Sequence, residues 1–202
     1  MGRNDFISGS VLEFKLPANL GIAYCKVLDF RYIREFDGVL AKVFDHVVKE
    51  PIDNVAELSE KDWMFGARRM PFLPGTRGKG AWVFRGVLIS EEDHVIPEFR
   101  YSTAISEKVG INHPWHIVRN INQYSEETYP FESVKHLENT IVSTRLGISI
   151  RAGMEYLRSK DIDVFSYFDL KDEVNTLIYR QMMSVTRYKD IPHSMRGKAI
   201  AR

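Results

Sequence analysis

The amino-acid sequence predicts an α+β protein in which strands come first and helices follow. Up to about residue 132, apolar runs rich in β-branched and aromatic residues alternate with turn residues, which is typical of antiparallel strands. After about residue 143 the apolar residues recur every three or four positions, the spacing of a helix that buries one face. We therefore expect a mostly antiparallel β-rich part, a barrel-like or strongly twisted sheet, with C-terminal helices packed on it.

The N-terminal strands are predicted to form a β-hairpin. An apolar stretch that includes Val11, Phe14 and Leu16 ends at a turn over residues 17–21, where Asn and Gly accept unusual backbone angles. The next run, residues 22–30, contains no breaker. Two such runs around a short turn indicate a hairpin.

The following segments are less uniform. Residues 38–49 fit a strand and a helix almost equally well, because their apolar spacing suits both. Residues 50–62 are acidic and mostly loop, and a strand is expected within 63–73. A glycine-rich loop precedes 81–89, the clearest strand in the chain, and 94–132 is expected to be irregular with one short strand.

Two helices are predicted in the last third of the chain. The first covers about residues 143–160, and the second begins with Asp169 as its N-cap and runs to about Tyr188. We therefore predict a single domain over 1–202. Within it we expect a β-rich part (8–132), a mainly helical part (133–190) and a flexible basic tail (191–202).

Composition excludes several classes of protein. The 202 residues carry a net charge of +1, which argues against a surface built wholly for nucleic acid or anionic lipid. Cys25 is the sole cysteine, so no intrachain disulfide forms. The N-terminus lacks the apolar region of a secretory signal, and no apolar run is long enough to span a membrane. We expect a cytoplasmic protein without membrane contact.

Candidate binding residues lie in a basic segment and at two tryptophans. Between residues 68 and 85 there are five basic residues and no acidic one, around a glycine-rich loop that could bind phosphate. An exposed tryptophan in polar or irregular surroundings suits a binding surface, whereas Trp82, inside the clearest strand, is expected in the core. The candidates are Trp63, Arg68, Arg69, Arg77, Lys79, Arg85 and Trp115.

Catalytic motifs do not emerge from the sequence. The glycine-rich loop lacks the Ser or Thr of a nucleotide-binding P-loop, and His113 and His116 have no further ligands at a recognised zinc spacing. Cys25 lies in an apolar run, where a free cysteine is usually a small buried hydrophobe. We therefore predict no enzyme activity, no cofactor and no metal. An enzyme with an unfamiliar site around these three residues is a further hypothesis.

Two stretches resemble the immunity protein 26 family of bacterial polymorphic-toxin systems. The first is Gly9-Ser-Val-Leu-Glu-Phe-Lys-Leu-Pro17 with the strand that follows its turn, and the second is Gly80-Ala-Trp-Val-Phe-Arg-Gly86 with its following acidic stretch and prolines. The resemblance covers about residues 8–100. It implies a β-rich N-terminal half and a protein that neutralises a toxin domain by binding it, without catalysis.

The sequence leaves the partner open. The leading hypothesis is a non-catalytic protein that blocks the active site of a cognate toxin domain. The alternative is a nucleic-acid-binding protein that uses segment 68–85 and the basic tail, with an affinity that falls steeply with salt. The apolar face of the second helix, including Met182 and Met183, could also support a homodimer.

Overall fold

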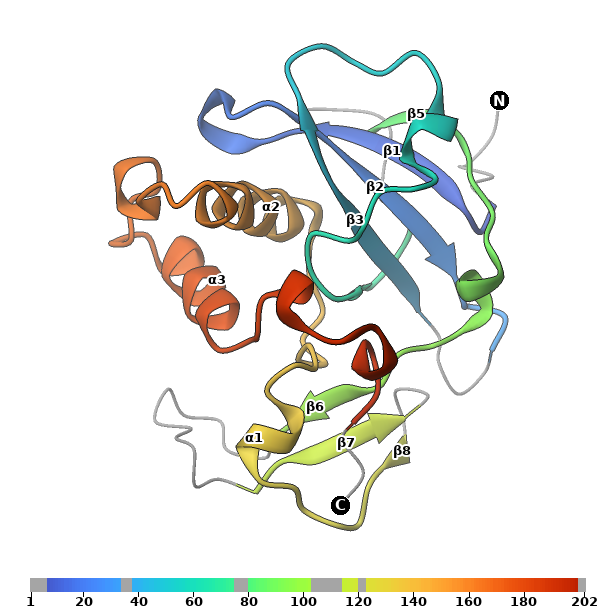
Figure 1. Ribbon diagram of the computed structural model, residues 1–202, viewed down its shortest axis with the longest axis vertical. Helices are drawn as coiled ribbons and strands as arrows, with labels where there is room; N and C mark the ends of the chain where they lie inside the picture. The colour runs from blue at the N-terminus through green and yellow to red at the C-terminus, as the bar shows by residue number, and fades with distance from the viewer. Residues whose placement is uncertain (1–6, 34–37, 75–79, 103–113, 120–122, 200–202) are drawn as a thin grey trace.

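Two antiparallel sheets and three helices make up the fold in the part of the chain that the structure describes (Figure 1). The structure is a computed structural model and describes residues 7–33, 38–74, 80–102, 114–119 and 123–199. The strands are β1 (Ser10–Lys15), β2 (Ile22–Asp29), β3 (Val39–Val48), β4 (Arg68–Met70), β5 (Val83–Val87), β6 (Phe99–Tyr101), β7 (His116–Arg119) and β8 (Gln123–Tyr124). The helices are α1 (Phe131–Val134), α2 (Arg145–Ser159) and α3 (Glu173–Met183). The α+β class is as predicted.

The predicted hairpin lies at the centre of the larger sheet, whose strand order is β4-β3-β2-β1-β5. In the register of the hairpin Ser10 lies opposite Val27 and Lys15 opposite Ile22. Residues 38–49, which fitted a strand and a helix alike, form β3 and pair with β2. In the described residues β4 and β5 are the two edges, so the sheet is open and the barrel-like alternative is wrong.

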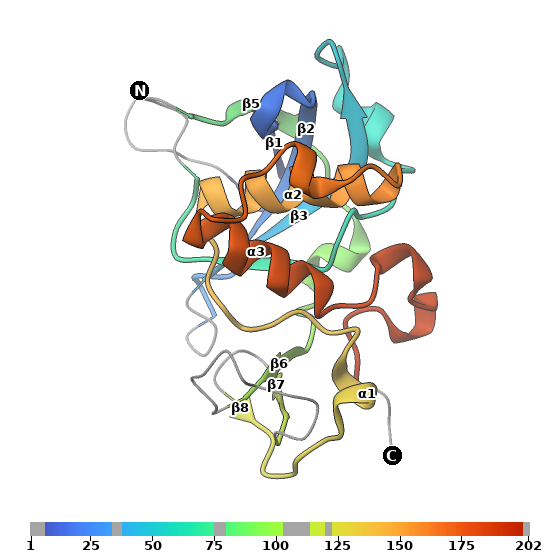
Figure 2. The same cartoon turned by 90° about the vertical axis from the view of Figure 1, so that its left-hand side faces the viewer.

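Helices α2 and α3 cover one face of the larger sheet (Figure 2). Odd-numbered residues of β2 and β3 point to this face, since side chains alternate along a strand. They share one core with the helices and with Trp82, which stacks on Phe14 at 4.7 Å between ring centroids, as expected of a core tryptophan. The core includes Cys25, Val27, Ala41, Val43, Ile148, Met154 and Met182.

The helix termini follow local capping chemistry. Thr144 accepts a hydrogen bond from the Gly147 amide, so α2 begins close to the predicted position. The second helix begins later than expected, because Asp169 accepts from the Lys171 amide in a preceding turn and Asp172 is the N-cap. It also ends at Met183, earlier than predicted.

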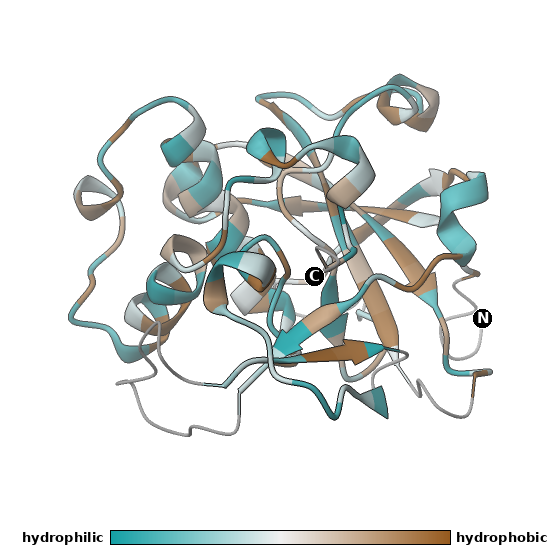
Figure 3. Cartoon of the chain, turned by 60° about the horizontal axis from the view of Figure 1, so that its bottom comes forward, coloured by the Kyte–Doolittle hydropathy of each residue, from teal (hydrophilic) through white to brown (hydrophobic). Residues whose placement is uncertain are grey.

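A smaller sheet, β6-β7-β8, occupies the region expected to be largely irregular. Phe99 and Val118 pack against Leu28, Phe30 and Leu40 at one end of the larger sheet. In Figure 3 the long strands are drawn mostly in the brown and pale shades of apolar residues, which agrees with this packing. Of the helices described, none is long and apolar enough to cross a bilayer.

Candidate functional site

A cavity of about 840 Å³ lies on the face of the larger sheet that α2 and α3 leave uncovered. Even-numbered residues of β2 and β3 point to this face and form the floor. These are Lys26, Leu40, Lys42 and Phe44. The walls come from segments within 59–67, 88–99, 136–138 and 188–198, which lie far apart in the sequence.

The wall of the cavity that comes from residues 188–198, here called the C-terminal wall, is fixed by hydrogen bonds to the rest of the protein. The Gly197 carbonyl accepts from the Glu98 amide at 2.9 Å, and the Ala199 amide donates to the Glu98 carboxylate at 2.6 Å. The ring of His136 lies 2.5 Å from the Lys198 carbonyl oxygen. Residues 191–199, which we expected in a flexible tail, therefore form part of the cavity through backbone contacts that the sequence does not reveal.

Lys26 is neutralised within the protein. Its ammonium lies 2.5 Å from the Asp93 carboxylate and 3.1 Å from the Ser90 hydroxyl, and both charged side chains are almost fully buried. Asp93 also accepts from the Ser90 amide in a capping box at the turn Glu91–His94. The acidic turn after β5 thus supplies the counter-charge for a lysine inside the sheet.

Lys42 lacks such a counter-charge. It lies directly opposite Lys26 in the β2–β3 register, and its Nζ atom is 4.2 Å from the centroid of the Trp63 ring. No carboxylate in the described part of the chain lies within 4.0 Å of this ammonium. Burial lowers the pKa of Lys42, and the positive charge of Lys26 lowers it further, while Glu92 and Asp93 oppose the shift.

An arginine and a tyrosine form the opposite wall of the cavity. The Arg196 guanidinium donates to both oxygens of Asp62, at 2.8 and 2.9 Å, and lies 4.5 Å from the centroid of the Tyr188 ring. Burial raises the pKa of Tyr188 to about 12. At neutral pH this tyrosine therefore offers an O–H group and an aromatic face.

The two candidate tryptophans have different environments. Trp63 is half-buried, contacts the Phe44 ring at 4.5 Å between centroids and lines the cavity. Trp115 is only 6% exposed and lies between β6 and α1, 5.6 Å from Phe131. Trp115 therefore packs in a small core with Ile117, Val134 and Leu137 and does not line the cavity in the described structure.

The basic candidates do not form one surface in the described residues. Arg68 is buried and forms an ion pair with Glu138, while Arg85 donates to the Glu13 carboxylate at 2.7 Å. Arg69 is half-buried, and burial lowers its pKa. Arg77 and Lys79 lie outside the described residues.

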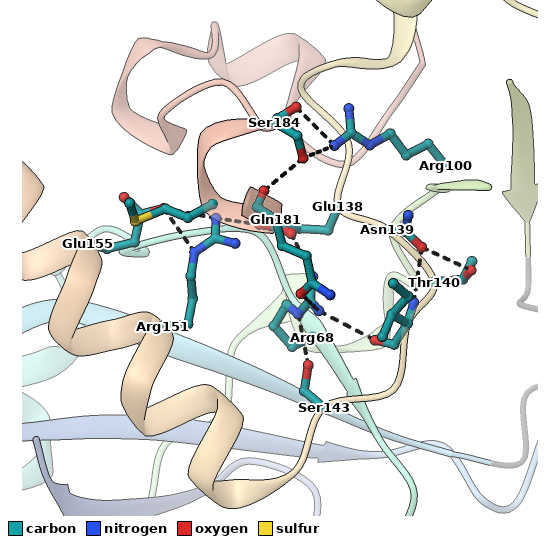
Figure 4. Close-up of polar contacts among 12 residues, drawn as sticks. Arg68, Arg100, Glu138, Asn139, Thr140, Ser143, Arg151, Glu155, Gln181 and Ser184 are labelled. Carbon is teal, nitrogen blue, oxygen red and sulfur yellow. Dashed lines mark hydrogen bonds and ion pairs between the residues drawn. The ribbon is translucent and has the colours of Figure 1, made fainter. Parts of the chain in front are cut away.

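The Arg68–Glu138 pair belongs to a buried cluster of charges (Figure 4). Arg151 of α2 lies 3.5 Å from the other oxygen of Glu138 and 2.8 Å from Glu155. Arg100 donates to the backbone and hydroxyl oxygens of Ser184, but its Nε and Nη1 atoms have no hydrogen-bond partner among the residues that the structure describes. The cluster joins β4 of the larger sheet and β6 of the smaller sheet to α2 and to Ser184, the residue after α3. It therefore links the two sheets to the helices.

Of the residues of the enzyme hypothesis, Cys25 and His116 lie on different sheets. Cys25 is fully buried on the helix-covered face of the sheet, where burial raises the pKa of its thiol. His116 lies on β7 with its Nδ1 atom 2.9 Å from the Ser125 carbonyl oxygen, and His113 lies outside the described residues. The described ranges contain no group of three or more His, Cys, Asp or Glu side chains placed to hold a metal ion.

The helix proposed for self-association divides its apolar residues between two environments. Ile178 and Met182 are buried against α2, whereas Val174, Leu177 and Met183 are about half exposed. Met182 therefore serves the core, and a homodimer through the exposed side of α3 stays a prediction.

Sequence reasoning missed Lys42, the counter-charge at Asp93 and the C-terminal wall. A signal for Lys42 was present, because Lys26 and Lys42 each interrupt a run of apolar residues, 22–28 and 39–44. No family model matches the chain, and searches of curated proteins and of solved structures return no match. The resemblance to the immunity protein 26 family stays a prediction.

Proposed function

We propose that this protein is a non-catalytic binding protein that receives a partner protein on the edge strand β5. Following the family resemblance, the partner would be a toxin domain in the cytoplasm of a bacterium, and its active site would be covered by the bound protein. The observation that carries the proposal is the exposed apolar character of β5 and of the residues that follow it.

Among the residues that the structure describes, strand β5 is an edge of the larger sheet and exposes apolar side chains at both of its ends. Val83 is 48% exposed, Val87 is 36% exposed and Ile89, just beyond the strand, is 68% exposed. Apolar edge strands are rare on monomeric proteins because they pair with other chains. In strand addition, a partner extends such an edge through main-chain hydrogen bonds and gains specificity from alternate side chains.

The charge on β5 does not protect this edge. Natural edges are often guarded by a charged side chain that opposes pairing. Arg85 is the charged residue of β5, and its guanidinium is turned to Glu13 on the neighbouring strand β1, at 2.7 Å. The exposed Val83 and Val87 are therefore not shielded by this charge.

Nucleic-acid binding receives less support from the geometry. Arg68 and Arg85 would have to leave Glu138 and Glu13 to contact phosphate, and Arg68 is buried. Of the candidate basic residues, only Arg77 and Lys79 are not placed by the structure. Nucleic-acid binding is therefore the alternative that the purification experiment below also tests.

Affinity purification from the native host, at low and at high salt, tests the proposal. We expect the wild-type protein to retain one protein partner at high salt. A Val83→Glu variant should lose it, because a carboxylate on the edge would enter the interface. Leu146→Glu, which changes an exposed apolar residue at the start of α2, is the matched control and should retain the partner.

Two outcomes would contradict the proposal. One is a partner that Val83→Glu retains as well as the control does. The other is recovery of nucleic acid alone, released by salt from wild type and from both variants, which would favour the basic segment.

A further inference from the structure

The floor of the cavity holds two positive charges side by side. Lys26 and Lys42 face each other across neighbouring strands on the same side of the sheet. Like charges in such a pair are unfavourable. Asp93 neutralises Lys26 at 2.5 Å, which leaves Lys42 as the unpaired cation of the floor among the described residues.

We propose that this cavity binds a small organic anion, with its carboxylate or phosphate group on Lys42 and its flat apolar part along Trp63. The volume of about 840 Å³ lies within the range of small-molecule sites. The lining combines aromatic and aliphatic side chains with many charged and polar ones. Its apolar members include Leu40, Phe44, Trp63, Leu88, Val95 and Pro97.

The other charged residues of the cavity indicate why the ligand is an anion. Arg196 is bound to Asp62, so its charge is already matched. Glu98 accepts from Arg119 and from the Ala199 amide, and Glu138 is paired with Arg68. Glu60, Lys61 and Lys198 are exposed at the rim, where water screens them. Glu92 is also exposed and offsets part of the positive charge of Lys42 without forming an ion pair with it among the described residues.

Trp63 defines the place of the apolar part of the ligand. Lys42 lies over its ring at 4.2 Å, and Phe44 holds that ring at 4.5 Å between centroids. A carboxylate that meets the Lys42 ammonium therefore lies beside an aromatic surface. An aryl carboxylate or aryl phosphate satisfies both features with one molecule.

The inference is independent of the partner protein proposed for β5. An acidic side chain of a partner could also reach Lys42, because Leu88, Ile89 and Ser90 follow β5 and line the cavity. A free small molecule is the simpler occupant, since the floor lies below walls from four separate segments. The experiment below distinguishes a small-molecule anion from an acidic side chain of a partner protein.

Titration of the purified protein with four small aromatic probes tests the proposal. Benzoate and phenyl phosphate carry the anion, whereas benzamide and benzylamine keep the ring and replace the charge by a neutral or a positive group. Isothermal titration calorimetry gives the affinities, and NMR of the indole N–H signals reports a tryptophan in the site. We expect both anions to bind and to shift one indole signal, which a Trp63→Phe variant removes.

Variants of Lys42 identify the charge that is responsible. Lys42→Met keeps the length of the side chain and should weaken benzoate binding by about tenfold or more, the effect of losing one charged hydrogen bond. Lys42→Arg should restore most of the affinity. Lys15→Met removes an exposed lysine of β1 that lies outside the cavity and is the matched control, for which no change is expected.

Three results would overturn the proposal. Benzamide could bind as tightly as benzoate, or Lys42→Met could bind benzoate like the wild type. The third is that a glutamate-rich peptide binds in a Lys42-dependent way while no small anion binds at millimolar concentration. That last result would assign Lys42 to the partner protein.

Discussion

Arg68 and Glu138 form a buried ion pair that joins the edge strand β4 to the segment before α2. The Arg68 Nη1 atom lies 2.8 Å from Glu138 Oε2, and the two side chains are 4% and 3% exposed. Arg151 shares the same carboxylate at 3.5 Å, and the charge of Glu138 also acts on Arg100. One carboxylate therefore compensates several guanidinium groups inside the fold.

Replacement of this carboxylate should strongly destabilise the protein. We expect Glu138→Gln to lower the free energy of unfolding by about 3 kcal/mol or more, because buried guanidinium groups lose their counter-charge. Urea denaturation of the variant measures the loss. Glu132→Gln, at an exposed pair with Lys135, is the control and should change stability by less than about 1 kcal/mol. Equal losses in the two variants would show that the cluster does not depend on Glu138.

The turn of the hairpin requires glycine at position 21. Its φ is +142°, and a Cβ atom there would lie 2.8 Å from the Val48 carbonyl oxygen. We expect Gly21→Ala to cost about 2 kcal/mol or more in the free energy of unfolding. Gly80→Ala separates backbone strain from steric contact, since Gly80 also has a positive φ, but no atom of the described residues lies within 4 Å of the added carbon. A smaller loss for Gly80→Ala would confirm that the steric contact matters.

The unpaired Lys42 should lower stability at neutral pH. The folded protein holds this proton less tightly than the unfolded chain, because the pKa of Lys42 is lowered. Protonation therefore favours unfolding, and the contribution of Lys42 to stability falls as the pH drops through the lysine range. We expect Lys42→Met to be more stable than the wild type by about 0.5 kcal/mol at pH 7.

The stability gain of Lys42→Met should shrink as the pH rises through the ordinary pKa of lysine, about 10.5, because above that pH Lys42 is uncharged in both the folded and the unfolded protein. Urea midpoints of both proteins between neutral and alkaline pH provide the comparison. A gain that stays constant with pH would mean that the charge of Lys42 is not its cause. A residue kept at a cost to stability is typical of a functional site.

Cys25 should react with thiol reagents only after the protein unfolds. The side chain is fully buried, and burial raises the pKa of the thiol, so little of the reactive thiolate forms. We expect Ellman's reagent to label the folded protein far more slowly than the protein in urea. The destabilised Gly21→Ala variant should react faster than the wild type. Immediate, complete labelling of the native protein would contradict the placement of Cys25.

Local features of the fold were predictable from the sequence. The hairpin follows from two apolar runs around a turn with Asn19 and Gly21, and α2 follows from its periodic apolar residues. The start of α3 was misplaced because Asp169 and Asp172 are both good capping residues, and only the first closes a turn before the helix. The short strands β6 to β8 carry too few residues to show a period.

The candidate site depends on contacts between distant residues. Arg68 was expected on a basic surface, but its carboxylate partner stands seventy residues further along the chain and draws it into the interior. Trp63 does line the cavity, whereas Trp115 packs beside α1. The sequence shows which residues carry charge or an aromatic ring, and the tertiary fold decides which of them meet.

The order in which the chain is made has a consequence for the C-terminal wall. Residues 188–198 close the cavity through Glu98 and His136, yet they leave the ribosome long after β2 and β3. Domains generally fold as units, and the sheet shares its core with α2 and α3. The walls of the cavity therefore come together only after synthesis has passed these helices, and the proposed ligand requires a chain that extends through residue 198.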